Sequence, residues 1–158
     1  MANTQSMCTS FMSELMTATH NFGTAPTRGT SAADTFKAAL YLASATINAS
    51  TTVYSSTGEV TGTNYTAGGV TVTNATPPAS TNTSATAGTA YWTASASITY
   101  TNVTLSTAFD CVLIYNSTQT NKAVSVHTFG SQTITAGTFT LTMPANTTST
   151  ALLRLATT

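Results

Sequence analysis

Apolar and polar residues alternate in short segments along most of this chain, and this alternation limits the fold more than any other feature of the sequence. In "GGVTVTN", Val70 and Val72 fall on one face of a strand and the intervening Thr side chains fall on the other. Similar segments, separated by Gly, Pro, Asn or Ser, recur about every ten residues from residue 50 onward. The spacing predicts an all-β fold, a β-sandwich or jelly roll of short antiparallel strands.

One segment, "DCVLIYN" at residues 110–116, is apolar on both faces, which predicts the central strand of the core. Upstream of it, Ile98 and Tyr100 stand at even positions, whereas Val103 and Leu105 stand at odd positions, so the apolar face of the strand changes sides between them. We therefore expect a β-bulge or a break near Asn102. The following "NSTQTN" predicts a turn, and "TTVYSS" at residues 51–56 predicts a short strand.

The N-terminal part of the chain differs from the rest. We expect residues 1–35 to form a helix and an arm, and residues 36–158 to form a β-sandwich domain. Met7, Phe11 and Leu15 recur every four residues, as on one face of a helix of about four turns. This stripe has two interpretations: it docks on a partner, or it covers one end of its own β-domain.

The segment "TFKAALYLASA" at residues 35–45 is ambiguous by periodicity. Its apolar positions suit a helix capped by Asp34, and they suit a strand equally well. The pattern alone leaves both alternatives open.

Charged side chains are unusually scarce. They make up 5% of the chain, with four basic and four acidic residues and a formal net charge of zero, while about a quarter of the residues are Thr. Nucleic-acid binding requires clustered basic residues, so we expect no nucleic-acid partner. Near-neutral chains self-associate readily, which favours a homo-oligomer. The basic residues are dispersed: Arg28, Lys37, Lys122 and Arg154.

The sequence offers few residues for catalysis. A triad of Asp110, His127 and one of many serines can be written down, but no G-x-S-x-G motif supports it. Cys8 and Cys111 form no metal-binding spacing, and we expect both to be reduced and packed. We therefore predict no enzyme, no cofactor and no metal site. There is no basic start of a signal peptide and no run of eighteen apolar residues, so we expect neither secretion nor a membrane-spanning segment.

An ordered set of short motifs resembles a group of small structural proteins of tailed bacteriophages. It begins with "AALYLA" and "STGEVTGTNYTAGGVTV", and continues, after a Pro- and Ser-rich loop, with "FDCVLIYNSTQTN" and "TITAGTFTLTMPA". The resemblance covers roughly residues 36–145 and implies a capsid cement or decoration protein, or a small tail accessory. It also favours a strand for "TFKAALYLASA". It brings no catalytic residues.

The glycine-rich stretch at residues 58–69 contains one charge, Glu59, and one aromatic side chain, Tyr65. Its glycines allow tight turns. The stretch either folds back on its own sheet, with Tyr65 at the edge of the core, or contacts a neighbouring subunit, where Tyr is favoured. The candidate interface residues of the chain are Met7, Phe11, Leu15, Glu59 and Tyr65.

Together these observations predict a virion structural protein, assembled in the host cytoplasm, that decorates the capsid. Its expected partner is the major capsid protein, which it binds as a dimer or trimer. The alternative is a tail component: an adaptor, tube or fibre-associated protein. A third interpretation, a carbohydrate-binding adhesin, requires Trp92 and Tyr91 to be exposed, whereas Trp92 also suits the core of a strand.

Overall fold

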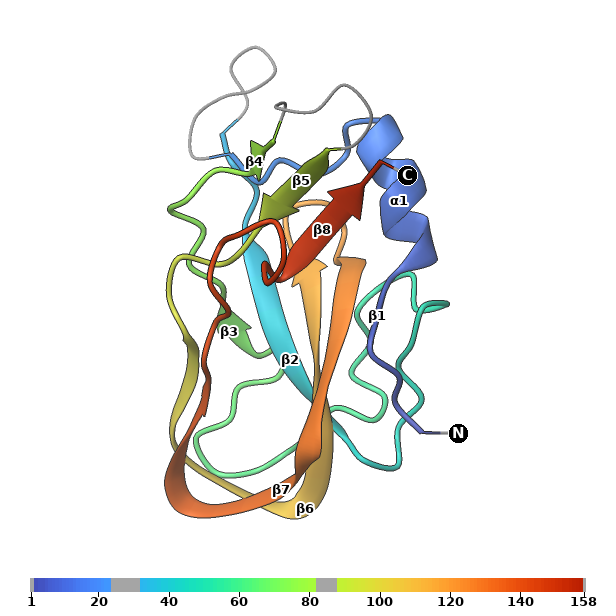
Figure 1. Ribbon diagram of the computed structural model, residues 1–158. Coiled ribbons are helices and arrows are strands. Elements are labelled where there is room, and N and C mark those ends of the chain that lie inside the picture. Colours follow the sequence, from blue (N-terminus) through green and yellow to red (C-terminus); the bar gives the residue numbers. More distant parts are fainter. Residues whose placement is uncertain (1, 24–31, 82–87, 158) are drawn as a thin grey trace.

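The computed structural model describes residues 2–23, 32–81 and 88–157, which are built mainly from antiparallel β-strands (Figure 1). Parts of the predicted arm, including Arg28, and of the predicted Pro- and Ser-rich loop lie outside the described residues. The elements are β1 (Ser6–Met7), α1 (Thr9–Met16), β2 (Phe36–Leu42), β3 (Val70–Thr71), β4 (Ala79–Ser80), β5 (Thr89–Trp92), β6 (Ile98–Asn116), β7 (Lys122–Leu141) and β8 (Leu153–Ala156).

The strands form two antiparallel sheets. The larger has the order β1-β7-β6-β2-β3 and the smaller has the order β4-β5-β8. The predicted all-β sandwich with an N-terminal helix is confirmed. Among the described residues, no helix is long and apolar enough to cross a membrane.

The core is built around the second half of β6. Every residue from Cys111 to Asn116 is buried, and β6 pairs with β7 on one side and β2 on the other. The prediction that "DCVLIYN" is the central strand is confirmed. A strand covered on both faces needs apolar side chains at both parities, which explains its lack of alternation.

Strands β6 and β7 form a long ribbon that folds over itself at the lower end of Figure 1. Phe109 pairs with Gln132, and Phe139 lies seven residues further along β7, roughly 23 Å away in a straight strand. The ring centroids of Phe109 and Phe139 are nevertheless 5.1 Å apart, so the ribbon must bend between them. The pairing shifts register beside Asn102, which has φ 51°, and this confirms the predicted bulge. Such shifts let β6 and β7 run longer than the short strands expected.

The N-terminal segment departs from the prediction. The helix spans eight residues, Thr9–Met16, about half the predicted length. Ser6 and Met7 instead form β1, which pairs with Val126 and Ser125 of β7. The free edge of β7 offers backbone hydrogen bonds there, and these override the helical spacing of the side chains. The N-terminal segment is thus part of the larger sheet.

Two further segments were expected to form strands, and only one of them does. "TFKAALYLASA" contains strand β2, whose residues are mostly buried on both faces, so the strand alternative is confirmed. "TTVYSS" does not form a strand: Val53 makes only an isolated bridge to Lys122. The segment is also held by a side chain, because the hydroxyl of Tyr54 donates to Glu59 at 2.6 Å.

Candidate functional site

The five candidate interface residues fall into two separate regions of the fold. Met7, Phe11 and Leu15 line an apolar groove beside α1. Glu59 and Tyr65 lie together in the glycine-rich loop, where a hydrogen bond joins their side chains.

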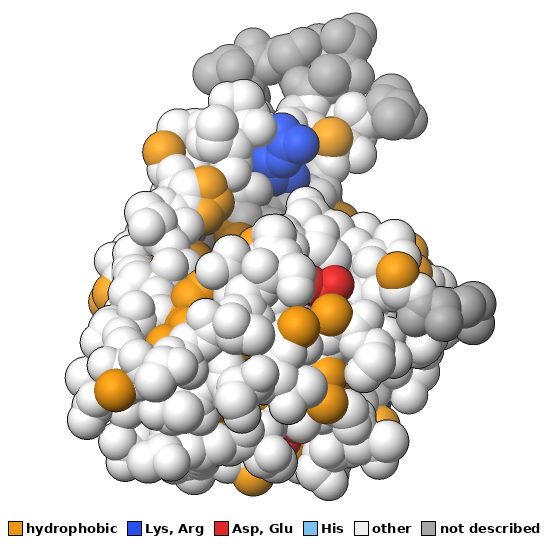
Figure 2. All heavy atoms as spheres, turned by 90° about the horizontal axis from the view of Figure 1, so that it is seen from below, with side chains coloured by type: hydrophobic (Ala, Val, Ile, Leu, Met, Phe, Trp, Pro, Cys, Tyr) orange, Lys and Arg blue, Asp and Glu red, His pale blue; other side chains and the backbone are white. Residues whose placement is uncertain are grey.

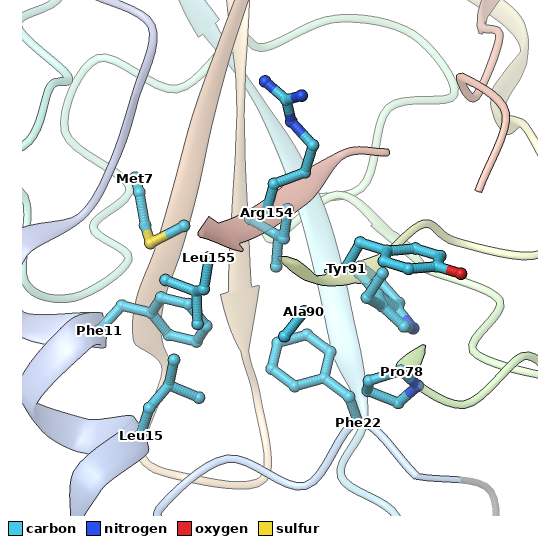
Figure 3. A pocket seen from close by; sticks show the side chains of 11 residues that line it. Met7, Phe11, Leu15, Phe22, Pro78, Ala90, Tyr91, Arg154 and Leu155 are labelled. Carbon is cyan, nitrogen blue, oxygen red and sulfur yellow. The ribbon is translucent and has the colours of Figure 1, made fainter. Parts of the chain in front are cut away.

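The groove lies between α1 and strands β5 and β8 and has a volume of about 100 Å³. Figure 3 shows Met7, Phe11 and Leu15 on the α1 side, with Phe22 and Tyr91 across from them. Phe11 is buried, whereas Met7 and Leu15 are partly accessible. The predicted apolar stripe therefore covers the chain's own core and also leaves part of itself open. The remaining lining residues are Pro78, Ala90, Trp92, Leu153, Arg154 and Leu155.

Among the described residues that line the groove, Arg154 is the one that carries a charge. Figure 3 shows its guanidinium turned away from the apolar side chains. That guanidinium donates to the carbonyl oxygens of Thr148 and Ser149, at 3.1 and 2.7 Å. The described lining of the groove therefore suits apolar groups, and the single charge in it is already hydrogen-bonded.

Large apolar side chains are exposed on α1 and β8, two of the elements that form the groove. Met16 is 88% exposed and Met12 is 46% exposed, both on α1, and Leu155 of β8 is 42% exposed. Met12 and Met16 are four residues apart, so they share one face of the helix. Methionine adapts to irregular partner surfaces because its side chain is unbranched and polarizable. We call the groove together with Met12, Met16 and Leu155 the α1 contact surface.

The glycine-rich loop is folded onto its own sheet through Glu59, which is buried. The hydroxyls of Tyr54 and Tyr65 donate to its two carboxylate oxygens at 2.6 and 2.7 Å, and the backbone N–H of Gly68 donates at 2.7 Å. The hydroxyl of Tyr65 also accepts the N–H of Leu40 in β2 at 3.0 Å. Burial and the neighbouring Glu59 carboxylate raise the pKa of Tyr65 far above its usual range. The tyrosines are therefore fixed as neutral donors.

Backbone geometry explains one glycine of this loop. Gly69 has φ +69°, and a Cβ there would overlap the carbonyl oxygen of Ala38 in β2. The loop can approach the strand this closely only with glycine. The hydrogen bonds of Glu59 and Tyr65 thus hold the loop on its own sheet.

A second polar network, the N-terminal clamp, consists of Glu14, His20, Asp34, Asn116 and Lys122. Lys122 Nζ donates to Glu14 Oε1 at 2.6 Å, and His20 Nε2 lies 2.8 Å from Glu14 Oε2. Asn116 Nδ2 donates to Asp34 Oδ2 at 2.7 Å and lies 3.0 Å from His20 Nδ1. The clamp joins α1 and the segment after it to the turn between β6 and β7.

Sequence reasoning missed both networks because their members are far apart in the chain. One signal was available: a chain with only four acidic residues has little reason to keep them except where they are needed. Glu14, Asp34 and Glu59 all hold hydrogen-bonded networks here, as buried or partly buried carboxylates require. In a charge-poor chain, an acidic residue is therefore itself a signal of a buried polar network.

The residues of the possible triad are not joined in a catalytic chain. Ser125 Oγ lies 2.9 Å from His127 Nε2, but Ser125 is buried. Asp110 instead accepts a hydrogen bond from Asn3 Nδ2 at 2.6 Å. Burial lowers the pKa of His127 to about 4, which makes it a weak base.

The other reactive side chains are also packed inside the fold. Cys8 and Cys111 are free and buried, and burial raises the pKa of each thiol to about 12. The described residues contain no group of three or more His, Cys, Asp or Glu that could hold a metal ion. Trp92 lies in the core, where its indole N–H donates to Asn74 and Thr76, so its ring is not displayed as an adhesin would require.

Comparison with known proteins gave no match: no protein-family model, no curated protein and no solved structure is significantly similar to this chain.

Proposed function

We propose that this chain is a virion structural protein that decorates a bacteriophage capsid and stabilises the lattice of the major capsid protein. The observation that carries the proposal is the α1 contact surface: an apolar groove with exposed Leu155 in its lining and exposed Met16 on the helix that forms one wall, on a chain with very few charges. Contiguous exposed apolar surface is typical of protein interaction sites.

The rest of the molecule supports a structural role in an assembly. Figure 2 shows a second face made mostly of backbone and of side chains that are neither apolar nor charged, with scattered apolar side chains and few charges. Such a surface binds through shape, apolar contact and backbone hydrogen bonds rather than through ion pairs. A symmetric dimer or trimer would add avidity on a symmetric lattice, because each additional contact is formed intramolecularly.

The motif order that resembles small phage structural proteins also supports this proposal. Its glycine-rich segment is the loop held by Glu59, and its "IYN" segment ends the central strand β6. These motifs maintain the fold, whereas the α1 contact surface is left for the partner. The alternative proposal is a tail component, which the same fold and surface would also suit.

Copy number in purified virions distinguishes the two proposals. A decoration protein would be present in hundreds of copies, comparable to the capsid protein, whereas a tail component would be present in about a dozen or fewer, as ring symmetry dictates. Quantitative densitometry of virion proteins measures this ratio. A low copy number, or a location restricted to the tail in particle images, would exclude capsid decoration.

Charge substitutions test the contact surface directly. We expect Met16→Glu and Leu155→Glu to weaken capsid binding at least about tenfold, equivalent to 1.4 kcal/mol, because each places a charge in an apolar interface. Thr133→Glu is the matched control: Thr133 is exposed and lies in β7 between Gln132 and Ile134, which pair with Phe109 and Leu105 of β6 rather than with the N-terminal segment. Equal binding by all three variants would show that the partner binds elsewhere.

A further inference from the structure

The N-terminal clamp contains a buried histidine whose protonation state is determined by its neighbours. The imidazole of His20 packs against aromatic rings, with centroid distances of 4.9 Å to Phe11, 6.4 Å to Phe22 and 6.5 Å to Phe36. Its two nitrogens face Asn116 and Glu14. The proton on this ring can therefore be assigned from hydrogen-bond geometry.

The orientation of the Asn116 amide is settled by three other groups. Its Nδ2 donates to Asp34 Oδ2 at 2.7 Å, and its Oδ1 accepts the backbone N–H groups of Thr118 and Gln119 at 3.1 and 3.2 Å. Flipping the amide would oppose donor to donor and acceptor to acceptor at all three contacts. The nitrogen of Asn116 must therefore face His20.

This orientation places a donor against His20 Nδ1, which must accept. The single ring proton is then on Nε2 and is donated to Glu14 Oε2 at 2.8 Å. His20 is consequently neutral in the closed clamp. A second proton on Nδ1 would point at the N–H of Asn116 and break that hydrogen bond.

Three charged groups face His20 from the elements packed around it. Glu14 of α1 and Asp34, just before β2, favour the charged ring, whereas Lys122 at the start of β7 opposes it. Burial is the largest influence, and it lowers the pKa of His20 below its ordinary value. Geometry and burial therefore both favour the neutral ring.

We propose that the N-terminal clamp is an acid-sensitive latch: protonation of His20 breaks its contact with Asn116 and releases α1 from the turn between β6 and β7. Glu14 connects His20 to α1 and to β7, because its carboxylate binds both His20 and Lys122. Release uncovers Phe11, Phe22 and the groove floor, so acid would enlarge the apolar surface that the chain offers to a partner. The proposed latch does not depend on the identity of the partner that binds the α1 contact surface.

The two cysteines give a built-in measurement. Cys8 caps the N-terminus of α1 and is buried, whereas Cys111 is buried in the central strand β6. Opening of the latch exposes Cys8 alone, and global unfolding exposes both. Thiol labelling with 4,4′-dithiodipyridine, which reacts in acid, followed by peptide mass spectrometry reports each site separately. The labelling rate of each cysteine is divided by the labelling rate of a free cysteine peptide at the same pH, which removes the intrinsic effect of pH on the reaction.

We expect protection of Cys8 to fall between pH 7.5 and 5.0 while Cys111 stays protected. If His20 binds the proton only in the open state, with an ordinary pKa of about 6.5, the equilibrium constant for opening of the latch rises by up to about 30-fold over this pH range. A rise of about fivefold or more in the labelling rate of Cys8, relative to the free peptide, supports the latch. Burial disfavours the charge of Glu14, but its hydrogen bonds from Lys122 and His20 outweigh burial and lower its pKa, which favours the ionised carboxylate.

His20→Gln keeps an amide donor for Glu14 but cannot titrate, so it should remove the pH-dependent rise. His127→Gln is the control, because it removes the other histidine and should retain the rise. A smaller rise at Cys8, parallel labelling of Cys8 and Cys111, or a rise that persists in His20→Gln would each overturn the proposal.

If His20→Gln does not fold, imidazole nitrogen NMR of the unaltered protein decides. The latch requires a neutral ring at pH 7.5 with its proton on Nε2 and a titration below pH 6.5. A proton on Nδ1, or a ring still charged at pH 7.5, would overturn it.

Discussion

Removing the hydroxyl of Tyr65 tests how the glycine-rich loop is held. In Tyr65→Phe, Glu59 loses one of its two phenolic donors, and the N–H of Leu40 loses its acceptor. The aromatic ring remains, so packing against Tyr100, whose ring centroid is 5.9 Å away, is retained. The substitution therefore isolates the two hydrogen bonds.

The expected loss follows from these two bonds. A hydrogen bond to a charged group contributes about 1.5–3 kcal/mol, and a buried N–H without an acceptor costs about 1–3 kcal/mol. Leu40 is fully buried, so water cannot easily replace the Tyr65 hydroxyl. We expect Tyr65→Phe to lower the free energy of unfolding by about 3–5 kcal/mol.

Tyr54→Phe is the matched control, because it removes one donor to Glu59 and leaves no backbone group without a partner. Tyr54 is half-buried, so water can reach the vacated oxygen, and we expect a loss of about 1–2 kcal/mol. Urea unfolding followed by the fluorescence of Trp92, the single tryptophan, measures both variants. If Tyr65→Phe were no less stable than Tyr54→Phe but failed to assemble, the loop would be a contact loop and the structural role would be refuted.

Four further outcomes are expected. Ile114→Ala should lower the free energy of unfolding by about 2–5 kcal/mol, because Ile114 is buried in β6, and an unchanged melting temperature would contradict this placement. His127 has a folded pKa of about 4 against about 6.5 when unfolded, so the unfolded chain binds its proton first and stability falls as pH drops through that window; denaturation at several pH values should show a flatter fall in His127→Gln. Deleting residues 1–33 removes β1, Cys8 and Phe11 from the core, and circular dichroism should show a strongly destabilised or unfolded product; a stable remainder would mean that the core is complete without them. Capsid affinity should change less than about tenfold between low and moderate salt, since screening acts on exposed charges and few are present; a steeper dependence in a binding titration would reveal ion pairs at the interface.

The sequence by itself determined the features that depend on near neighbours. The apolar run around Ile114 marked the central strand because a strand covered on both faces cannot alternate. The parity change around Asn102 marked the bulge because one extra residue reverses which side chains face the core. The spacing of Phe11 and Leu15 identified the apolar face of α1, since side chains four residues apart share a helix face, and Met7 lies beside that face although it belongs to β1.

The opposite wall of that groove could not be found in this way. It comes from β5 and β8, and these strands lie beside α1 only because the chain folds into two sheets. The length of the helix also depended on tertiary structure: β7 has a free edge that recruits Ser6 and Met7. Side-chain spacing is unchanged by that pairing, so the sequence pattern alone could not reveal it.

Only the tertiary structure decided which polar residues work together. Glu14 and Lys122 are 108 positions apart, and His20 and Asn116 are 96 apart, so no local pattern links them. Burial then makes each carboxylate and imidazole require a partner, because a lone charge in a dry interior is costly. The folding of the ribbon, the loop around Glu59 and the N-terminal clamp all follow from contacts between distant segments, which depend on three-dimensional packing rather than on the order of residues along the chain.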